Sequence, residues 1–280
     1  MCMLAYTTYS ESGGVGKTTL TANLADAHSQ QGRDVLVLDL DPQQGSLSYL
    51  LDIPTSRDDD VADNIARHLI DEPKGEFSEL IQETPYGFDV VPSHGMLENL
   101  PQLLMKAQNL AEDLGEEFSP NDRLRQVLID ADIRREYDTI IIDPPASPGP
   151  HLYNAVSATR SLLLPVKPTG KGMQSIAGIE DILTNLEANL DLDLGVLAIV
   201  PNGIGSTSDQ EQYLEEIQQL GYDAPVTIRD RSALFEGSWD QRCTAFYYFG
   251  HHRSHKRDYE AETLDKLRDL AAHIEEVGDQ

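Results

Sequence analysis

The chain has 280 residues, 40% of them hydrophobic, which is enough for a globular protein with a sizeable core and too many for a disordered chain. Its 48 acidic residues are spread along the whole sequence against 21 basic ones, so the net charge of −27 excludes a general electrostatic attraction to nucleic acid. No apolar run approaches the roughly 20 residues of a membrane span, and the N-terminal segment lacks the pattern of a signal peptide. The two cysteines, Cys2 and Cys243, make neither a disulfide framework nor a metal cluster. We therefore expect a cytoplasmic protein.

The acid excess is accompanied by a scarcity of lysine, of which the chain has only seven. One interpretation is a highly soluble surface. The other, which we favour because the two features occur together, is adaptation to a salt-rich cytoplasm, where a dense carboxylate surface holds water and cations. In either case, binding to nucleic acid requires a local basic patch.

Apolar runs of strand length alternate with helical patterns along the chain. The first run, residues 3–9, leads into a glycine-rich loop and then into a helical stretch that ends at Gly32. An exposed insertion is expected at 55–63, a short capped helix at 63–70 and an amphipathic helix at 260–277. Further strands are expected at 34–41, 88–93, 137–145, 160–166 and 194–202, with a weaker one at 224–228.

This alternation predicts an α/β fold. Strands joined by helices form a mostly parallel twisted sheet with helices on both faces. We expect a single domain over residues 1–280, because the sequence contains no linker, repeat or low-complexity tract. Ligands of such folds bind at the carboxyl ends of the strands.

The segment GGVGKTT, residues 13–19, lies between an expected strand and an expected helix, which is the context of a phosphate-binding loop. Glycines let backbone N–H groups surround phosphates, and the helix N-terminus adds its positive end. Lys17 is expected to contact the β- and γ-phosphates, and Thr18 to offer its hydroxyl to Mg²⁺. The loop residues predicted to bind nucleotide are Gly13, Gly14, Val15, Gly16, Lys17, Thr18 and Thr19.

Two expected strands end in acidic residues beside this loop. Asp39 and Asp41 close the strand at 34–41, and a carboxylate there can hold a metal-bound water or orient the attacking water. Asp143 closes the strand at 137–145 and would reach Mg²⁺ through water, and the proline- and glycine-containing loop that follows suits a switch that senses the γ-phosphate. We predict catalytic roles for Lys17 and Asp41, and a metal site formed by Thr18, Asp41 and Asp143.

Two further patterns each have more than one interpretation. Pro201 and Asn202 end the strand at 194–202; the asparagine amide matches an adenine edge, and it also matches a simple turn. The segment HHRSHKR, residues 251–257, is the densest basic stretch. It fits a nucleic-acid patch or a solvated surface, whereas a histidine metal site lacks supporting carboxylates or cysteines.

In this order, GGVGKTT, LDLDPQ and IIIDPP resemble the motifs of the ParA/MinD family of deviant Walker ATPases. DVVPSHGMLENL and IRDRSALFEGS resemble further segments of ParA proteins, so the resemblance covers nearly the whole chain. It implies an ATPase that binds ATP and Mg²⁺, dimerises over two nucleotides and hydrolyses ATP slowly. It also implies that Asp41 activates water and that Arg229 and Asp230, in the second segment, belong to the nucleotide site.

The ParA branch implies non-specific DNA binding by the ATP-bound homodimer and release when a partner stimulates hydrolysis. Arg253 matches a DNA-contacting arginine of ParA proteins, and Lys256 and Arg257 are assigned to the same patch. The expected protein is therefore nucleoid-associated. With a ParB-like or McdB-like adaptor it would position or partition a plasmid, a chromosome or a protein compartment.

One position departs from the family pattern. The family usually has lysine where this chain has Ser12, and that lysine crosses the dimer to neutralise phosphate charge. The chain is similar here to the McdA-like branch, in which serine replaces this lysine and a lysine far along the chain takes over. We favour Lys171, whose neighbouring glycines allow close approach, with Lys167 second. Both follow the strand at 160–166, at the edge where the nucleotide should lie.

Three other functions stay open. A MinD-like spatial regulator would bind membrane through a basic C-terminal helix, but this chain ends in an acidic one, so no membrane partner is expected. A metabolic P-loop enzyme of the same superfamily would act on a small molecule without binding DNA. A nucleotide-gated scaffold would bind ATP without hydrolysing it. Measuring ATP turnover with and without DNA separates these functions.

Overall fold

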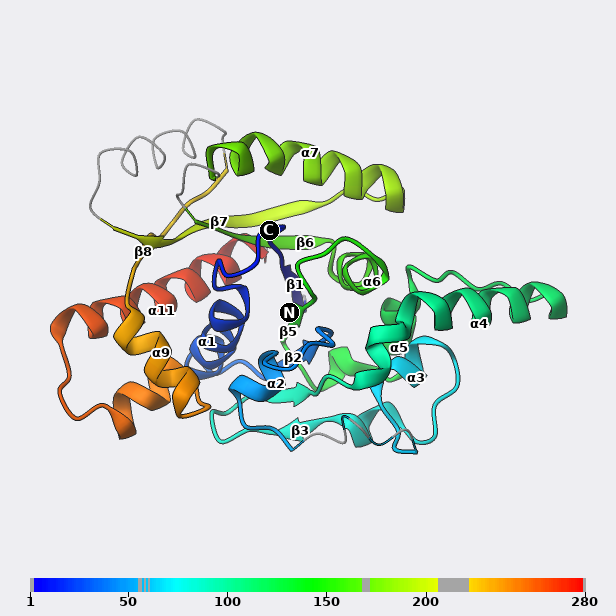
Figure 1. The fold of residues 1–280 in the computed structure, drawn as a ribbon, viewed down its shortest axis with the longest axis horizontal. Helices are drawn as coiled ribbons and strands as arrows, with labels where there is room; N and C mark the ends of the chain where they lie inside the picture. Colours follow the sequence, from blue (N-terminus) through cyan, green and yellow to red (C-terminus); the bar gives the residue numbers. More distant parts are fainter. Residues whose placement is uncertain are drawn as a thin grey trace.

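The computed structural model describes residues 3–54, 57, 59, 61–167, 172–205 and 222–278. Its centre is an eight-stranded sheet with the order β3-β4-β2-β5-β1-β6-β7-β8 (Figure 1). All neighbouring strands are parallel except β3 and β4, so the α/β fold predicted from the sequence is confirmed. The strands are β1 Leu4–Thr8, β2 Val35–Asp39, β3 Gln82–Glu83, β4 Asp89–Val91, β5 Thr139–Asp143, β6 Ser161–Val166, β7 Gly195–Ile204 and β8 Ile228–Arg229.

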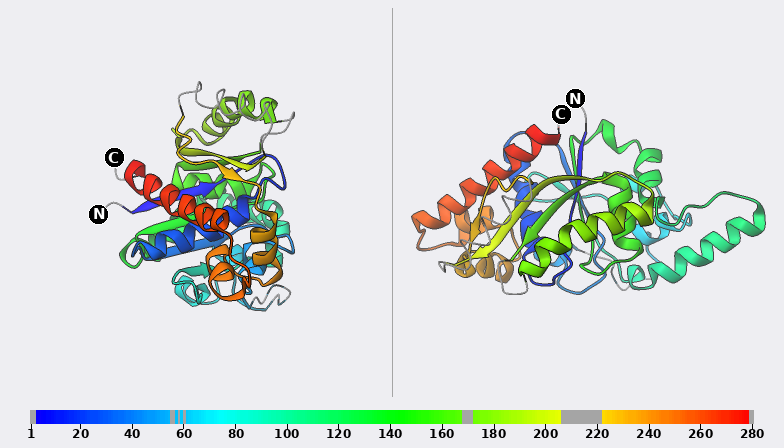
Figure 2. Two further views of the ribbon diagram at one scale, coloured as in Figure 1. Left: turned by 90° about the vertical axis from the view of Figure 1, so that its left-hand side faces the viewer. Right: turned by 90° about the horizontal axis from the view of Figure 1, so that it is seen from above.

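Helices cover both faces of this sheet (Figure 2). Alternate side chains of the strands point to opposite faces, so the apolar runs of β2 and β5 supply both cores. One core packs against α1 (Lys17–Gln30), α2 (Leu47–Leu50) and α11 (Asp258–Gly278). The other faces α3 (Ile65–Leu69), α4 (Leu100–Leu114), α5 (Arg123–Asp130), α6 (Pro150–Thr159) and α7 (Gly172–Leu190).

Shorter helical segments complete the described chain. After β8 the chain forms α9 (Ser232–Asp240), α10 (Ala245–Tyr247) and the π-helical turn η4 (Tyr248–His252). Three 3₁₀ turns are η1 (Phe77–Leu80), η2 (Gly95–Asn99) and η3 (Ile133–Arg135). Helix α4 extends away from the body of the protein (Figure 1). None of the described helices combines the length and the apolarity that crossing a bilayer would take.

Local signals in the sequence explain where several elements begin and end. Helix α1 is followed by Gly32 in the left-handed conformation, with φ of +86°, as the sequence predicts. The predicted helix at 63–70 is confirmed as α3, whose N-cap Asn64 accepts a hydrogen bond from the Arg67 N–H. The predicted strand at 224–228 is wrong for most of its length, because β8 begins only at Ile228. Of the predicted insertion at 55–63, residues 55, 56, 58 and 60 lie outside the described residues.

The strand register decides which acidic residues meet. Asp39 of β2 lies directly beside Asp143 of β5, and β1 is the next strand of the sheet after β5. Because parallel strands end at one edge, the loop after β1 opens beside both of these acidic strand ends. The sheet thus assembles a candidate site from segments more than 100 residues apart.

Candidate functional site

The loop between β1 and α1 has the backbone conformation that its glycines predict. Gly14 and Gly16 have φ of +74° and +90°, in the left-handed region that other residues adopt at a cost. Gly16 caps α1, and a Cβ atom at this position would collide with the side chain of Asn202. The free N–H groups at the start of α1 therefore face the space that the loop encloses, which suits an anion.

Lys17 and Thr18 converge on Asp143. Lys17 Nζ donates to Asp143 Oδ1 at 2.7 Å, Thr18 Oγ donates to Oδ2 at 2.9 Å, and Thr21 Oγ donates to Oδ1 at 3.3 Å. Asp143 is fully buried and Lys17 is 8% exposed. The structure thus brings together the predicted phosphate-binding lysine and two of the three predicted metal ligands.

The two acidic residues at the end of β2 differ in their surroundings. Asp39 is fully buried and accepts hydrogen bonds from Ser46 Oγ at 2.7 Å, Ser48 Oγ at 2.6 Å and the Ser48 N–H at 2.8 Å. Burial, together with the nearby Asp143 charge, raises the pKa of Asp39 to about 6. This carboxyl group orders the loop after β2. Asp41 is only half-buried, so of the two it is the one available to a ligand.

These groups surround a cleft of about 790 Å³. Its walls are the phosphate loop from Glu11 to Thr19, Asp41 with Gln43, the segment 145–148 after β5, and Trp239 of α9. Asp143 lies beneath the floor, reached through Lys17 and Thr18. The cleft therefore joins the loop predicted to bind phosphate, the acid predicted to activate water and the segment predicted to act as a switch.

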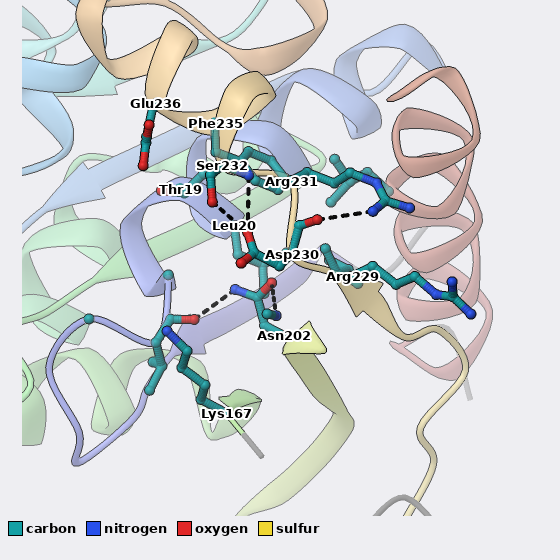
Figure 3. A pocket seen from close by; sticks show the side chains of 16 residues that line it. Thr19, Leu20, Lys167, Asn202, Arg229, Asp230, Arg231, Ser232, Phe235 and Glu236 are labelled. Atoms are coloured by element: carbon teal, nitrogen blue, oxygen red, sulfur yellow. Dashed lines mark hydrogen bonds between the residues drawn. The ribbon is translucent and has the colours of Figure 1, made fainter. Parts of the chain in front are cut away.

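A second cavity of about 220 Å³ lies beside the loop, lined by Asn202, Gly203, Arg229, Asp230 and Phe235 among others (Figure 3). Thr19 lines both this cavity and the larger cleft. Asp230 accepts hydrogen bonds from the hydroxyl and N–H of Ser232, which lower the pKa of this carboxyl group. An elongated ligand with an anionic end and a cyclic end could occupy both spaces.

Asn202 has both ends of its amide engaged by the backbone. Its Nδ2 donates to the Val15 carbonyl at 2.7 Å, and its Oδ1 accepts from the Gly203 N–H at 2.9 Å. This geometry favours a tethering and turn-forming role over the adenine-reading role. The adjacent Pro201 is buried in β7 beside Val166 and does not line the cavity.

Ser12 stands where the family pattern has a lysine, and one of the two candidate replacement lysines lies near the loop. Ser12 is exposed at the rim of the cleft. Lys167 follows β6 and lines the smaller cavity together with Gly14, and Figure 3 shows its side chain rising toward the phosphate loop. Lys171, the favoured replacement for the missing lysine, lies outside the described residues.

Within the basic segment, Arg253 is paired with a buried acid, and its predicted DNA contact stays a prediction. Arg253 is not a free surface cation: its Nη2 donates to Glu260 Oε1 at 2.6 Å and its Nε donates to Oε2 at 3.2 Å, and Glu260 is only 1% exposed. Lys256 and Arg257 are exposed. Within the described part of the chain, no group of three histidine, cysteine or acidic residues is arranged to hold a metal.

One residue of the cleft has no counterpart among the predictions. Trp239 donates from its indole Nε1 to Thr19 Oγ at 2.8 Å. It is the only tryptophan of the chain, and 220 residues separate the two partners. No local pattern in the sequence indicates a contact over this separation.

The parallel sheet, the glycine-rich loop before α1 and the Lys17–Thr18–Asp143 cluster define a P-loop nucleoside triphosphatase. The sequence model for the AAA domain matches residues 5–194. The chain belongs to this family, as a ParA-like P-loop ATPase.

Characterised and uncharacterised relatives share much of the sequence. An uncharacterised protein of Methanocaldococcus jannaschii is 30% identical over 235 residues, which cover 80% of this chain and 83% of that protein. The chromosome-partitioning ATPase Soj of Thermus thermophilus is 30% identical, with 68% of this chain and 65% of Soj covered. The maintenance of carboxysome distribution protein A of Synechococcus elongatus is 24% identical, with 80% and 84% covered.

Solved structures share the fold. Apo McdA from Cyanothece superimposes with a TM-score of 0.75 at 20% identity, over 97% of this chain and 99% of McdA. Cobyrinic acid a,c-diamide synthase from Mycobacterium smegmatis, with a bound ATP analogue and magnesium, has a TM-score of 0.67 at 22% identity, over 90% and 97%. At these identities the likeness concerns the fold alone.

Proposed function

We propose that this protein is an ATPase that binds ATP and Mg²⁺ in the cleft, dimerises when ATP is bound, and positions or partitions a cargo on non-specific DNA with an adaptor protein. The observation that carries the proposal is the convergence of Lys17, Thr18, Asp41 and Asp143 around one cleft. The partitioning and distribution roles in the names of the sequence relatives support the cargo-positioning part. A protein with this function would lie in the cytoplasm, associated with the nucleoid.

The residues present fit a magnesium ion. Thr18 Oγ and the carboxylate of Asp143 are 2.9 Å apart and supply the hard oxygen ligands that Mg²⁺ prefers, and Asp41 supplies a third at the cleft wall. Bound there, Mg²⁺ would neutralise charge that develops on the phosphates. In this proposal Thr18 binds the ion directly and Asp143 acts through water.

Lys17 and Asp41 have different roles in hydrolysis: Lys17 contacts phosphate and Asp41 orients water. Lys17 is 2.7 Å from Asp143 and lines the cleft, so its ammonium group can turn toward a bound phosphate. Of the two acids at the end of β2, Asp41 is the one that faces the cleft, since Asp39 is enclosed by serine donors. We assign Asp41 to orienting the attacking water. Gly13 to Thr19, Arg229 and Asp230 would hold the nucleotide, the last two around its base. Asn202 would act indirectly, by tethering the phosphate loop through the Val15 carbonyl.

The dimer and DNA parts of the proposal depend on cations at two other places. Lys171, or Lys167 beside the loop, would supply the charge that Ser12 cannot. Lys256 and Arg257 are exposed and would contact DNA phosphates, whereas Arg253 would support this turn through Glu260. The apolar face of α11 is buried in the core, which opposes a membrane-binding role for this helix.

The decisive experiment measures ATP hydrolysis with and without DNA. We expect slow turnover by the parent chain, and we expect Asp41→Ala to keep ATP affinity, lose turnover and accumulate as a dimer. Asp113→Ala, an exposed acid on α4, is the matched control. Loss of ATP binding in Asp41→Ala, with normal turnover at saturation, would contradict the assigned role.

The DNA contact has a separate test. Lys256→Glu/Arg257→Glu should weaken DNA binding of the ATP-bound form and flatten its salt dependence by about two units of slope. Lys106→Glu/Arg135→Glu makes the same charge change elsewhere on the exposed surface and should have a much smaller effect. Equal effects of the two pairs would reject the patch and leave only general repulsion.

A second candidate follows from the fold shared with cobyrinic acid a,c-diamide synthase. A metabolic P-loop enzyme would use the same cleft for ATP and a small-molecule substrate. Such an enzyme would neither bind DNA nor respond to it. A parent chain that hydrolyses ATP but ignores DNA at low salt would favour this candidate.

A further inference from the structure

Helix α9 borders both halves of the candidate nucleotide site. Its first turns, with Ser232 and Phe235, line the smaller cavity (Figure 3). Its last turn places Trp239 in the wall of the larger cleft. The helix makes one side-chain hydrogen bond to α1, from Trp239 Nε1 to Thr19 Oγ at 2.8 Å. Thr19 itself lines both spaces, so it lies where the base half and the phosphate half of a nucleotide would meet.

The direction of this hydrogen bond is fixed by chemistry. An indole N–H can only donate, so the Thr19 oxygen must accept. The Thr19 hydroxyl proton then has to point elsewhere. Among the described residues, Thr19 Oγ makes no hydrogen bond besides the one from Trp239, and it does not bond back to the carbonyl of Val15, which instead accepts from Asn202.

We propose that Trp239 is a positioning residue that holds the Thr19 hydroxyl as a donor toward a phosphate oxygen of the bound nucleotide. This inference rests on the proposed function. Without the indole, the hydroxyl rotates freely and donates to water, and α9 loses its hydrogen bond to the phosphate-loop helix. With the indole, the proton is aimed in advance, so that less rotational freedom is lost on binding. Trp239 does not touch the reacting atoms in this proposal; it acts through Thr19.

The test is a double-mutant cycle on Mg-ADP affinity, measured by calorimetry. Trp239→Phe keeps an aromatic ring and removes the N–H, and it should weaken Mg-ADP binding about fivefold, the effect of one net hydrogen bond. In a Thr19→Val background the same change should have no further effect, because the acceptor is gone. In a Thr19→Ser background, which keeps the hydroxyl, the fivefold effect should return.

A purely structural role for the tryptophan gives a different pattern. Trp239→Phe would then weaken binding equally in all three backgrounds, and this result would overturn the proposal. So would unchanged affinity in the single variant. A parent chain that fails to bind Mg-ADP would instead contradict the proposed function itself, so the two failures can be told apart.

Because the chain has one tryptophan, a second measurement needs no tryptophan variant. A ¹H–¹⁵N spectrum of the parent contains one indole N–H signal. This signal should be protected from solvent exchange, move when Mg-ADP is added, and in Thr19→Val appear at the position of a water-exposed indole without the nucleotide response. A signal that is identical in parent and Thr19→Val would show that the hydrogen bond does not form in solution.

Discussion

Two ion pairs in this protein look alike and differ in what surrounds them. Lys17 meets Asp143 at 2.7 Å, and Arg253 meets Glu260 at 2.6 Å; both carboxylates are fully or almost fully buried. Asp143 also accepts from the hydroxyls of Thr18 and Thr21 at the floor of the cleft. Glu260 has, besides Arg253, only the backbone N–H of Arg257 at 3.1 Å among the described residues.

The difference decides which cation a ligand can use. If Lys17 turns to a phosphate, Asp143 keeps two hydroxyl donors and, in the proposed function, gains a metal ion. If Arg253 turned to DNA, Glu260 would remain buried with a single N–H partner, which is costly for an ionised carboxylate. A basic side chain paired with a buried carboxylate is therefore available to a ligand at Lys17, whereas at Arg253 it is required by the fold.

The largest effect is expected on nucleotide affinity, from removing Lys17. Lys17→Met should lower Mg-ATP affinity by about 100-fold, the value of losing charge-assisted contacts to phosphate. The loss of folding stability, read from the thermal midpoint, should be much smaller than the loss of binding free energy, because Asp143 keeps the Thr18 and Thr21 donors. Lys106→Met on the exposed face of α4 is the control. An unchanged Mg-ATP affinity of Lys17→Met in calorimetry would show that the cleft does not bind the phosphates.

Changes to the Arg253–Glu260 pair should lower the free energy of unfolding, and removing the cation should cost more than neutralising the acid. Arg253→Met leaves Glu260 buried without its cation and should cost about 3–5 kcal/mol of unfolding free energy. Glu260→Gln should cost only about 1–2 kcal/mol, since the Arg253 side chain is 21% exposed and can turn to water. Urea unfolding of both variants measures the difference.

Arg135→Met is the matched control for that asymmetry, because its ion pair with Asp132 is exposed and should be worth about 0–1 kcal/mol. Equal costs for Arg253→Met and Glu260→Gln would show that burial of Glu260 does not set the energy. If Arg253→Met lost DNA binding while its stability was unchanged, Arg253 would be a DNA contact and not a residue that stabilises the fold.

The same contrast separates the features that the sequence predicts from those that depend on packing. The alternation of apolar runs was sufficient for the parallel sheet, and the spacing of GGVGKTT between a strand and a helix was sufficient for the loop, because both depend on local patterns. Asp39 and Asp41 are two residues apart and chemically identical, so only the serine donors after β2 distinguish the enclosed acid from the available one. Arg253 and Trp239 likewise depend on packing partners, Glu260 and Thr19, that no local pattern specifies.

Asp39 is a third buried carboxyl group, with hydroxyl donors and no ion pair among the described residues. Burial, followed by the charge of Asp143, raises its pKa from 3.8 to about 6. A pKa raised by folding means that protonation favours the folded state, so the stability this group contributes is present below about pH 4 and is lost as pH rises through about 6. The loss is about 3 kcal/mol in full, of which roughly half falls between pH 5 and 8.

Asp39→Asn removes this titration and should therefore move stability in a pH-dependent way. The variant loses the hydrogen bond that Asp39 Oδ1 accepts from the Asp41 N–H at 3.1 Å, so it should be less stable than the parent at pH 5. The gap should then close by about 1–1.5 kcal/mol on going to pH 8, because only the parent must bury a charge. Urea unfolding at pH 5, 6, 7 and 8 follows the gap, with Asp113→Asn on the exposed face of α4 as the control. A gap that stays constant with pH would mean that the serine donors compensate fully for burial, and that a carboxylate at this edge of the sheet needs no cation to remain ionised.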